Sequence, residues 1–420
     1  MQYLGTDANY QDIANIAQHI LERRNIQKEI FAHPNIALLD AVEATWTQET
    51  ETFAWDTTNY RLGSKSGKLT TTSGSYNAVA SRSLSFNGSG KMFSIWLKKS
   101  STITGISIFV LAPDWSNYAN FGVGVANYPN DTWFNLIFPM DTMTITGNPN
   151  LGSIATLRIE AIGSVNTATL HFDDIRLAHS ALPKGAIMIA FDDGNDSDFI
   201  YAKAKMDEYG YRGVSYIIGN QVGQSNYLTI AQMKQMQDIG WDIASHSWSH
   251  PDYTTLTEAQ MLQETISMKH YLSKNGFASG ARFFAYPYGA VNTLTLDTVA
   301  KYHLISRGVG SFGVTLGVSN VPLFSPSYLQ CAVVINTTTT SVLNTWINNV
   351  KSTKSLGCIL FHRLVAASPT EWQYLVSNFN TFIDAIAASG VPVVTMSDLA
   401  DKLLPAHVVT QDPIAWLNLM

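Results

Sequence analysis

Two short segments gather carboxylate and imidazole side chains at spacings that suit metal chemistry. Asp192 and Asp193 follow the apolar run 185–191, and because neighbouring side chains on an extended backbone point apart, the two acids can serve different tasks. His246 and His250 lie four residues apart, which places both imidazoles on one face of a helical turn. Two imidazoles and one carboxylate are a familiar ligand set for zinc-like cations, with a position left open for water. The spacing therefore predicts a catalytic metal site.

Two later segments carry further candidate residues at the ends of apolar runs. The first is 285–289, with the sequence AYPYG, and the second ends in His362, with the sequence LFH. Taken singly, each motif has an ordinary explanation, because Asp-Asp-Gly is a frequent turn and histidines four apart arise by chance on many helices. Their occurrence at the ends of strands in one strand–helix series predicts a common site.

The order of four motifs, FDDG, HSWSH, AYPYG and LFH, resembles that of the polysaccharide deacetylases that share the NodB homology domain. The resemblance covers residues 183–404, where the closing VVTMSDLADKL is similar to the last strand and helix of that domain. It implies a distorted (β/α) barrel of about seven strands. It also implies removal of acetyl groups from sugars with one divalent metal, Zn²⁺ in most cases, with Co²⁺, Ni²⁺ and Mn²⁺ as alternatives.

The resemblance assigns roles by position in the motifs. Asp193, His246 and His250 would be the metal ligands. Asp192 would be the general base and His362 the general acid. Such a set suits acetyl hydrolysis, because a metal lowers the pKa of its water towards about 7 and an imidazole of pKa about 6.5 can protonate a leaving group.

The third motif would complete the pocket around the reacting carbonyl. The resemblance implies that the backbone N–H of Tyr288 helps the metal to hold the oxyanion and that Pro287 and Gly289 shape this loop. Trp248, between the two histidines, is predicted to line the same pocket.

Two features of the family pattern are missing from this sequence. Many members have an Arg at or beside the position of Ala285, where it pairs with the catalytic acid. The family's Asp-and-Trp motif that orients the acid histidine is also not recognisable. The candidate replacements are Arg282, Arg307 or Arg363 for the arginine, and Trp346 or Asp398 for the orienting motif.

The elements that position these motifs form an alternating series after residue 183. Repeated strand–helix units of this kind require a parallel sheet with helices outside it, either a barrel or a doubly wound sheet. The predicted strands are 185–191, 213–218, 241–245, 282–286, 303–308, 329–334, 357–362 and 391–396. The predicted helices are 196–208, 229–239 (capped by Thr229), 257–274, 293–302, 340–351 and 370–388.

Residues 45–180 show a different pattern, in which short alternating segments are separated by Gly, Asn, Ser and Pro. Segments such as 92–99, 133–140 and 155–163 predict an antiparallel β-sandwich, or jelly roll. The closing HFDDIRL looks like the last strand of carbohydrate-binding jelly-roll modules. The fold class is therefore multidomain, with a sandwich followed by a distorted (β/α) barrel at 181–420.

The sandwich offers two candidate binding features. Trp96, Trp115 and Trp133 could stack on pyranose rings as a sugar platform, although aromatic residues are more often core or loop anchors. Asp173 and Asp174 could hold a structural Ca²⁺ through hard oxygen ligands.

Residues 1–44 are predicted to be a helical segment. The isoleucine spacing over 10–31 favours an amphipathic helix, which either packs on its own chain or forms a homo-oligomeric stalk. The first residues, MQYLGTDANYQD, lack the basic start and apolar core of a signal peptide. The low charge and the many Asn, Thr, Ser, Gly and Tyr residues are common on extracellular β-rich proteins, so we expect an extracellular protein. It is either secreted after removal of its signal or associated with a virion.

The composition limits the classes of partner. The formal net charge of −6 and the absence of Lys or Arg runs argue against nucleic acid and anionic membranes, and an uncharged polymer such as an acetylated polysaccharide fits better. No apolar stretch reaches the roughly 18 to 20 residues needed for membrane insertion. Cys331 and Cys358 are predicted to be two buried thiols.

The sequence thus predicts a metal-dependent hydrolase that removes N- or O-linked acetyl groups from a polysaccharide, with a bacterial surface glycan favoured as substrate. One alternative is a sugar-binding protein whose barrel has lost turnover, which the missing Arg motivates. Another is a phage tail-spike component that carries the deacetylase activity.

Overall fold

The chain divides into two compact units at residues 181 and 182. The computed structural model describes residues 36–403 except 51, 73–75, 126–127, 179–181, 183, 313–317 and 320–326. The helix predicted over 10–31 lies outside the described residues. The prediction of a helical segment up to residue 44 is wrong at its end, because β1 (Ile36–Asp40) pairs with the last strand of the first unit, β12 (Thr169–Ala178).

The first unit contains two six-stranded antiparallel sheets. Side chains from both sheets meet in the core, where the ring of Phe121 stacks on that of Phe138 with centroids 4.0 Å apart. One sheet holds β1, β3 (Thr52–Asp56), β4 (Ser66–Thr70), β6 (Met92–Lys99), β9 (Trp133–Pro139) and β12. The other holds β2 (Thr47–Thr50), β5 (Asn77–Phe86), β7 (Ile103–Leu111), β8 (Tyr118–Gly124), β10 (Thr144–Thr146) and β11 (Ile154–Gly163).

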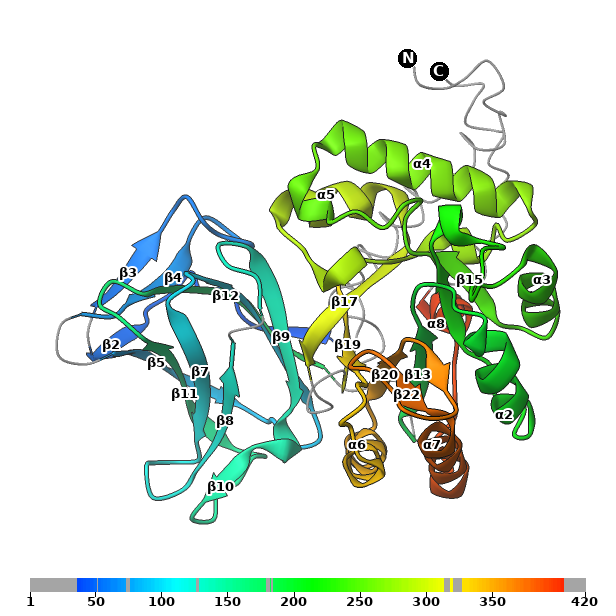
Figure 1. Ribbon diagram of the computed structural model, residues 1–420. Helices are drawn as coiled ribbons and strands as arrows, with labels where there is room; N and C mark the ends of the chain where they lie inside the picture. Colours follow the sequence, from blue (N-terminus) through cyan, green and yellow to red (C-terminus); the bar gives the residue numbers. More distant parts are fainter. Residues whose placement is uncertain are drawn as a thin grey trace. The chain divides into compact units, whose positions relative to one another are not determined.

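The second unit is built on a closed barrel of seven parallel strands within the described residues (Figure 1). The barrel closes because the first strand pairs with the last, Phe191 lying opposite Phe361. A short antiparallel strand, β18 (Val318–Ser319), adds to the edge of β20. In spatial order the barrel strands are β13 (Ala186–Phe191), β14 (Val214–Ile217), β15 (Asp242–Ser245), β16 (Phe283–Ala285), β17 (Ile305–Phe312), β19 (Leu329–Val333) and β20 (Leu356–Phe361).

Helices surround this barrel, as the repeated strand–helix pattern predicts (Figure 1). The N-cap expected at Thr229 is confirmed, because its side chain accepts from the backbone N–H of Gln232 in a capping box. The helices are α2 (Ala204–Asp207), α3 (Ile230–Asp238), α4 (Glu258–Lys274), α5 (Thr293–Tyr302), α6 (Thr340–Thr353), α7 (Val376–Ser389) and α8 (Met396–Leu403).

Three predicted elements differ from the structure. The helix expected over 196–208 is a π-helix at Asp198–Lys203 that continues as α2. The strand expected over 391–396 is reduced to one bridge between Val393 and Ile187, because the neighbouring Pro392 has no N–H to donate. The helix expected over 370–388 begins only at α7, and the residues before it form a loop with two short paired strands, β21 (Leu364–Val365) and β22 (Tyr374–Leu375).

Two expectations from composition can be compared with the described residues. Cys331 and Cys358 are buried and free, as predicted, and lie on the neighbouring strands β19 and β20. Among the described residues, no helix combines the length and the apolar character needed to span a membrane.

Candidate active site

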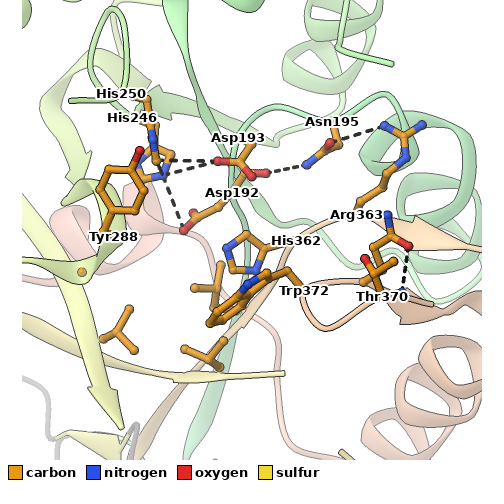
Figure 2. Close-up of a pocket in the computed structure, with 15 residues that line it drawn as sticks. Asp192, Asp193, Asn195, His246, His250, Tyr288, His362, Arg363, Thr370 and Trp372 are labelled. Carbon is orange, nitrogen blue, oxygen red and sulfur yellow. Dashed lines mark hydrogen bonds and ion pairs between the residues drawn. The ribbon is translucent and has the colours of Figure 1, made fainter. Parts of the chain in front are cut away.

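The predicted motifs meet at the carboxyl edge of the barrel (Figure 2). Asp192 and Asp193 follow β13, His246 follows β15 and His362 follows β20. These strands are parallel, so their carboxyl ends face the same side, where barrel enzymes place their sites. The residues line a cavity of about 510 Å³. Its lining is Asp192, Asp193, Asn195, His246, His250, Tyr288, Gly289, Val309, Val333, Leu360, His362, Arg363, Thr370, Trp372 and Gln373.

Asp193, His246 and His250 converge at distances that fit a single divalent ion. Their ligand atoms all lie within 4.8 Å of one another. The two Nε2 atoms are 3.1 Å apart, and Asp193 Oδ1 lies 3.7 Å from His246 Nε2 and 3.8 Å from His250 Nε2. Tetrahedral ligands about 2.0–2.2 Å from zinc are separated by about 3.3 Å, so the three atoms are close to the required spacing.

The protonation of the two histidines also suits metal binding. His246 Nδ1 lies 2.9 Å from the carbonyl oxygen of Ala285 and donates to it, which leaves the Nε2 lone pair directed at the cluster. Burial lowers the pKa of His246 to about 4. Burial and the neighbouring His246 lower the pKa of His250 to about 4. Both imidazoles are therefore neutral near pH 7, the form that binds a metal.

These pKa values predict how metal affinity depends on pH. Protons compete with the metal for imidazole nitrogen only when the pH falls towards the pKa, so the two histidines should keep their affinity for Zn²⁺ from pH 8 down to about 5. Histidines with the ordinary pKa of about 6.5 would begin to lose it below that pH. Competition against a fluorescent chelator calibrated at pH 5.0 and 7.5 measures the difference. A tenfold or larger loss between pH 6.5 and 5.5 would contradict this protonation state.

Both histidines belong to the loop 246–250, which is held in place by hydrogen bonds to helix α4. Glu264 of α4 accepts hydrogen bonds from the backbone N–H groups of Trp248 and Ser249 and from the Ser249 hydroxyl. Within the loop, the N–H of His250 donates to Ser247 Oγ. Glu264 was not predicted from the sequence, because its position in the middle of a helix gives no local signal of contact with a distant loop.

Left-handed backbone conformations cluster at this edge of the barrel. Asp193, Ser247, His250 and Tyr288 have φ values of 70°, 66°, 61° and 58°. Each such conformation in a residue with a side chain costs roughly 1–2 kcal/mol and persists only where the surroundings impose it, commonly at functional sites. The loops are therefore shaped to aim these residues.

Asp192 is paired inside the barrel with Arg307. The guanidinium of Arg307 forms an ion pair with Asp192 Oδ1, and the two side chains are 0% and 5% exposed. Asp192 Oδ2 lies 3.7 Å from His246 Nε2, so this oxygen faces the metal cluster. Arg307 also lies over the ring of Tyr216, 4.6 Å from its centroid. The pair fixes the carboxylate with one oxygen towards the ligand set.

Of the three candidate arginines, Arg307 is therefore the one that forms an ion pair with a candidate catalytic residue, Asp192. It lies on β17 directly beside Ala285 of β16 in the strand register. Arg282 instead donates to the carbonyl of Ser279, and Arg363 pairs with Asp196. The expected partner was the acid histidine, and this expectation is wrong, because the guanidinium meets the carboxylate of Asp192.

His362 lies at the end of β20 beside the cavity and is packed by an aromatic residue that the sequence analysis did not identify. The ring of Trp372 meets that of His362 with centroids 5.5 Å apart at 62°. Burial lowers the pKa of His362. The two residues proposed to orient it lie elsewhere: Trp346 packs against Phe382, and Asp398 accepts from the N–H of Thr395.

The third motif lies partly at the cavity. Tyr288 and Gly289 line it, and the ring of Tyr288 meets that of His250 with centroids 4.6 Å apart. Pro287 is buried in the turn before them. Trp248 is not part of the lining, which corrects its predicted role. It packs instead against Gly219 and Tyr271.

The three tryptophans proposed as a sugar platform do not come together. Trp96 and Trp133 belong to one sheet of the first unit, whereas Trp115 lies between β7 and β8 of the other. The guanidinium of Arg61 lies 4.2 Å from the centroid of Trp96, and Trp133 is only 9% exposed. A platform built from these three residues is therefore excluded.

The aspartates proposed as calcium ligands have other partners. Asp173 accepts from the backbone N–H groups of Arg61, Leu62 and Asp174. Asp174 Oδ1 is 2.6 Å from Arg176 Nε. In the described part of the chain, the cluster at the barrel edge is the one group of three such side chains at ligand distance. Asp173 thus anchors the loop at Arg61 and Leu62, Asp174 pairs within its own strand, and the calcium expectation finds no support here.

Together, the closed barrel and the residues at its carboxyl edge describe a (β/α)-barrel protein with a cavity that holds a candidate metal-binding cluster. Residues 179–305 match the family model described as polysaccharide deacetylase. This match ends before β19 and β20, so the position of His362 is given by the fold and not by the family match.

Curated relatives carry related names. "Putative polysaccharide deacetylase YxkH" of Bacillus subtilis (strain 168) is 32% identical over 115 residues, which are 27% of this chain and 41% of that protein. "Poly-beta-1,6-N-acetyl-D-glucosamine N-deacetylase" of Staphylococcus epidermidis is 26% identical over 133 residues, 28% of this chain and 46% of that protein. The chain thus spans less than half the length of these relatives.

Among solved structures, the chain is similar to the Xyl-CE4 domain of a multidomain xylanase from the hindgut metagenome of Trinervitermes trinervoides. The identity is 22% and the TM-score 0.38, over 52% of this chain and 91% of that one. A family 4 acetyl xylan esterase from Clostridium thermocellum, solved in complex with a cobalt ion, is 19% identical with a TM-score of 0.35, over 51% and 89% of the two chains.

Proposed function

We propose that this protein is a metal-dependent hydrolase that removes acetyl groups from a polysaccharide, with a bacterial surface glycan as the favoured substrate. The observation that carries the proposal is the convergence of Asp193, His246 and His250 beside Asp192 and His362 in one cavity. These residues supply a ligand set, a buried carboxylate and a separate imidazole, the three parts that acetyl hydrolysis needs. The family match over residues 179–305 supports the substrate class.

The ligand set fits a divalent ion such as Zn²⁺ in spacing, tautomer and charge. When bound, the ion supplies a Lewis acid that polarises the acetyl carbonyl and lowers the pKa of water. Asp192 then removes the proton from the water that attacks the carbonyl carbon. Its ion pair with Arg307 holds Oδ2 towards the cluster for this transfer. In the proposed reaction, the backbone N–H of Tyr288 donates a hydrogen bond to the developing oxyanion.

The leaving group must receive a proton as the bond from the acetyl carbon to the sugar nitrogen or oxygen breaks. His362 lines the cavity and is the imidazole outside the ligand set. Because burial lowers its pKa, its protonated form is a stronger acid than an exposed imidazolium. The proton passes from His362 to the sugar, and acetate carries the oxygen of the water.

Acetate release from a panel of acetylated glycans tests the proposal. Chitin-like oligomers, peptidoglycan, acetylated xylan and a bacterial exopolysaccharide are incubated with and without added Zn²⁺. We expect release that is abolished by chelation, restored by Zn²⁺ and lost in Asp192→Asn. Asp238→Asn, on the exposed face of α3, is the matched control and should retain full activity.

The alternative of a sugar-binding protein without turnover was motivated by the missing arginine beside Ala285. Arg307 supplies a guanidinium next to that position, although it pairs with Asp192 and not with His362. Stoichiometric metal binding without cleavage of any acetylated glycan or synthetic acetyl ester would contradict the hydrolase and favour that alternative. We also propose that the protein acts outside the cell, on the support of its low content of charged residues, 14%. The stalk and virion interpretations depend on residues 10–31 and stay predictions from the sequence.

A further inference from the structure

Cys331 and Cys358 take no part in the proposed chemistry, yet they lie directly beneath the cavity. Val333 and Leu360 line the cavity, and each cysteine precedes one of them by two residues on the same strand. Side chains two residues apart on a strand point to the same face. Both thiols therefore face the interior of the barrel, one layer below the cavity.

The two cysteines lie opposite each other on neighbouring strands of the barrel (Figure 1). β19 and β20 pair in parallel at Ala332 with Ile359 and at Val333 with Leu360, and the cysteines come one position earlier on both strands. Neighbouring strands are about 4.8 Å apart, within the Cα separation of about 4.4–6.8 Å that a disulfide spans. The two Sγ atoms are 2.7 Å apart. The sheet thus holds the two thiols at a separation that a disulfide can bridge.

The junction that the thiols span is short. β20 pairs with β13 from Leu356 through to Phe361, along the whole strand. Among the described residues, its pairing with β19 covers only Ile359 and Leu360. A covalent link between the cysteines would fasten β20, which ends beside His362, to β19. It would also constrain the unfolded chain, because the two cysteines are 27 positions apart in sequence.

The native fold keeps both thiols unreactive. Both side chains are 0% exposed. Burial raises the pKa of the Cys358 thiol, and the neighbouring Cys331 raises this pKa further. Because the thiolate is the form that attacks a disulfide, a buried and protonated thiol exchanges slowly. The state of the pair is therefore set during folding, before the barrel closes around it, and is retained afterwards.

We propose that Cys331 and Cys358 form an intramolecular disulfide when the chain folds in oxidising surroundings, and that this bond links β19 to β20 beneath the cavity. The oxidant is another disulfide, of a protein or of a small thiol compound. One Cys thiolate attacks it to give a mixed disulfide, and the other Cys then attacks the chain's sulfur atom in that bond. Two S–H bonds break and one S–S bond forms in the chain, while the oxidant takes up two electrons and two protons and leaves as two thiols.

Alkylation after unfolding tests the bond. The full chain is produced in the reducing cytosol and, with an added signal peptide, in the oxidising periplasm of a bacterial host. Each product is unfolded in guanidinium with iodoacetamide, with and without prior reduction, and its mass is measured. The chain contains two cysteines, so every label reports on this pair. We expect two labels on the cytosolic chain, none on the unreduced periplasmic chain and two after its reduction.

A second measurement tests the link between the strands. In urea titration, the periplasmic form should have an unfolding equilibrium constant roughly 10²-fold lower than that of the cytosolic form. The double variant Cys331→Ala/Cys358→Ala should show no difference between the two compartments. Native cytosolic chain that is incubated with oxidised glutathione before unfolding should still take two labels, because the thiols are buried. Loss of these labels would contradict the retention of the reduced state.

Cys331→Ala is the matched control, because it leaves Cys358 without a partner and should take one label from either compartment. Two labels on the unreduced periplasmic chain, or a disulfide between two chains on a non-reducing gel, contradict the proposal. No label on unreduced periplasmic Cys331→Ala shows oxidation by another route and contradicts the pairing. Equal unfolding constants with the disulfide closed contradict the link between the strands. Acetate release is measured separately, and its absence counts against the hydrolytic function and not against the disulfide.

Discussion

Arg307→Met is expected to lower acetate release by about 10²-fold or more, because a misplaced reacting group can cost that factor even when binding is kept. Arg307 does not line the cavity, so it acts through the Asp192 carboxylate that it holds. The loss should therefore fall on kcat, with KM for the glycan nearly unchanged. Arg307→Lys keeps the charge without the planar fork, and we expect intermediate kcat with a stable fold.

The same substitution should destabilise the metal-free protein. Breaking a buried ion pair by removing one partner typically costs about 3–5 kcal/mol, because the other charge stays buried without compensation. The double variant Asp192→Asn/Arg307→Met removes both charges, so it should recover most of the lost free energy of unfolding but none of the activity. Urea titration measures the unfolding free energies, and the partly exposed Arg282→Met serves as control.

Two outcomes would contradict this role of Arg307. If Arg307→Met retained wild-type kcat, the ion pair would not be needed to orient the carboxylate. If the single and the double variant lost equal stability, the cost would come from the missing packing of the arginine against Tyr216 rather than from an unpaired charge.

The convergence of Asp193, His246 and His250 could be predicted from the sequence because its signal is local. His246 directly follows β15, and Asp193 follows β13 after one intervening residue. The apolar runs of both strands are easy to identify, and parallel strands bring their carboxyl ends to one edge. His250 needs only its spacing from His246. The barrel was predictable for the same reason, since all of the strands expected before 391–396 except 303–308 are followed by a predicted helix.

The partner of Asp192 could not be assigned, because it depends on the register between strands. Ala285 and Arg307 are 22 positions apart in sequence but lie side by side on β16 and β17. The guanidinium of Arg307 therefore reaches the interior of the barrel from the strand next to β16, level with Ala285. Three arginines were compatible with the sequence, and only the pairing of strands distinguishes them.

The packing of Trp372 against His362 was missed because the residues around Trp372 resemble the start of a helix. Residues 370–375 extend the periodic pattern of α7, but the backbone carbonyl of Glu371 is bonded to Asn336 from a distant loop. A tertiary hydrogen bond thus overrides local propensity. The tryptophans of the first unit failed as a platform for a related reason, since sheet membership is set by pairing rather than by composition.

His362→Ala is expected to reveal its role through the nature of the leaving group. A sugar amine or alkoxide must be protonated as it departs, and removing a general acid costs about 10²–10⁴ in rate. The leaving group of 4-nitrophenyl acetate is a stable phenolate that departs without a proton. We therefore expect kcat to fall by about 10²-fold or more on the glycan and much less on the aryl ester.

This comparison separates proton donation from damage to the site. A disordered cavity or a lost metal would lower both rates together, whereas loss of the acid lowers only the one that needs its proton. Zn²⁺ content should remain that of the wild type, because His362 lies outside the ligand cluster. His270→Ala, an exposed histidine of α4, is the matched control and should leave both rates unchanged. Equal losses on the two substrates with full metal content would contradict the assignment of His362 as the acid.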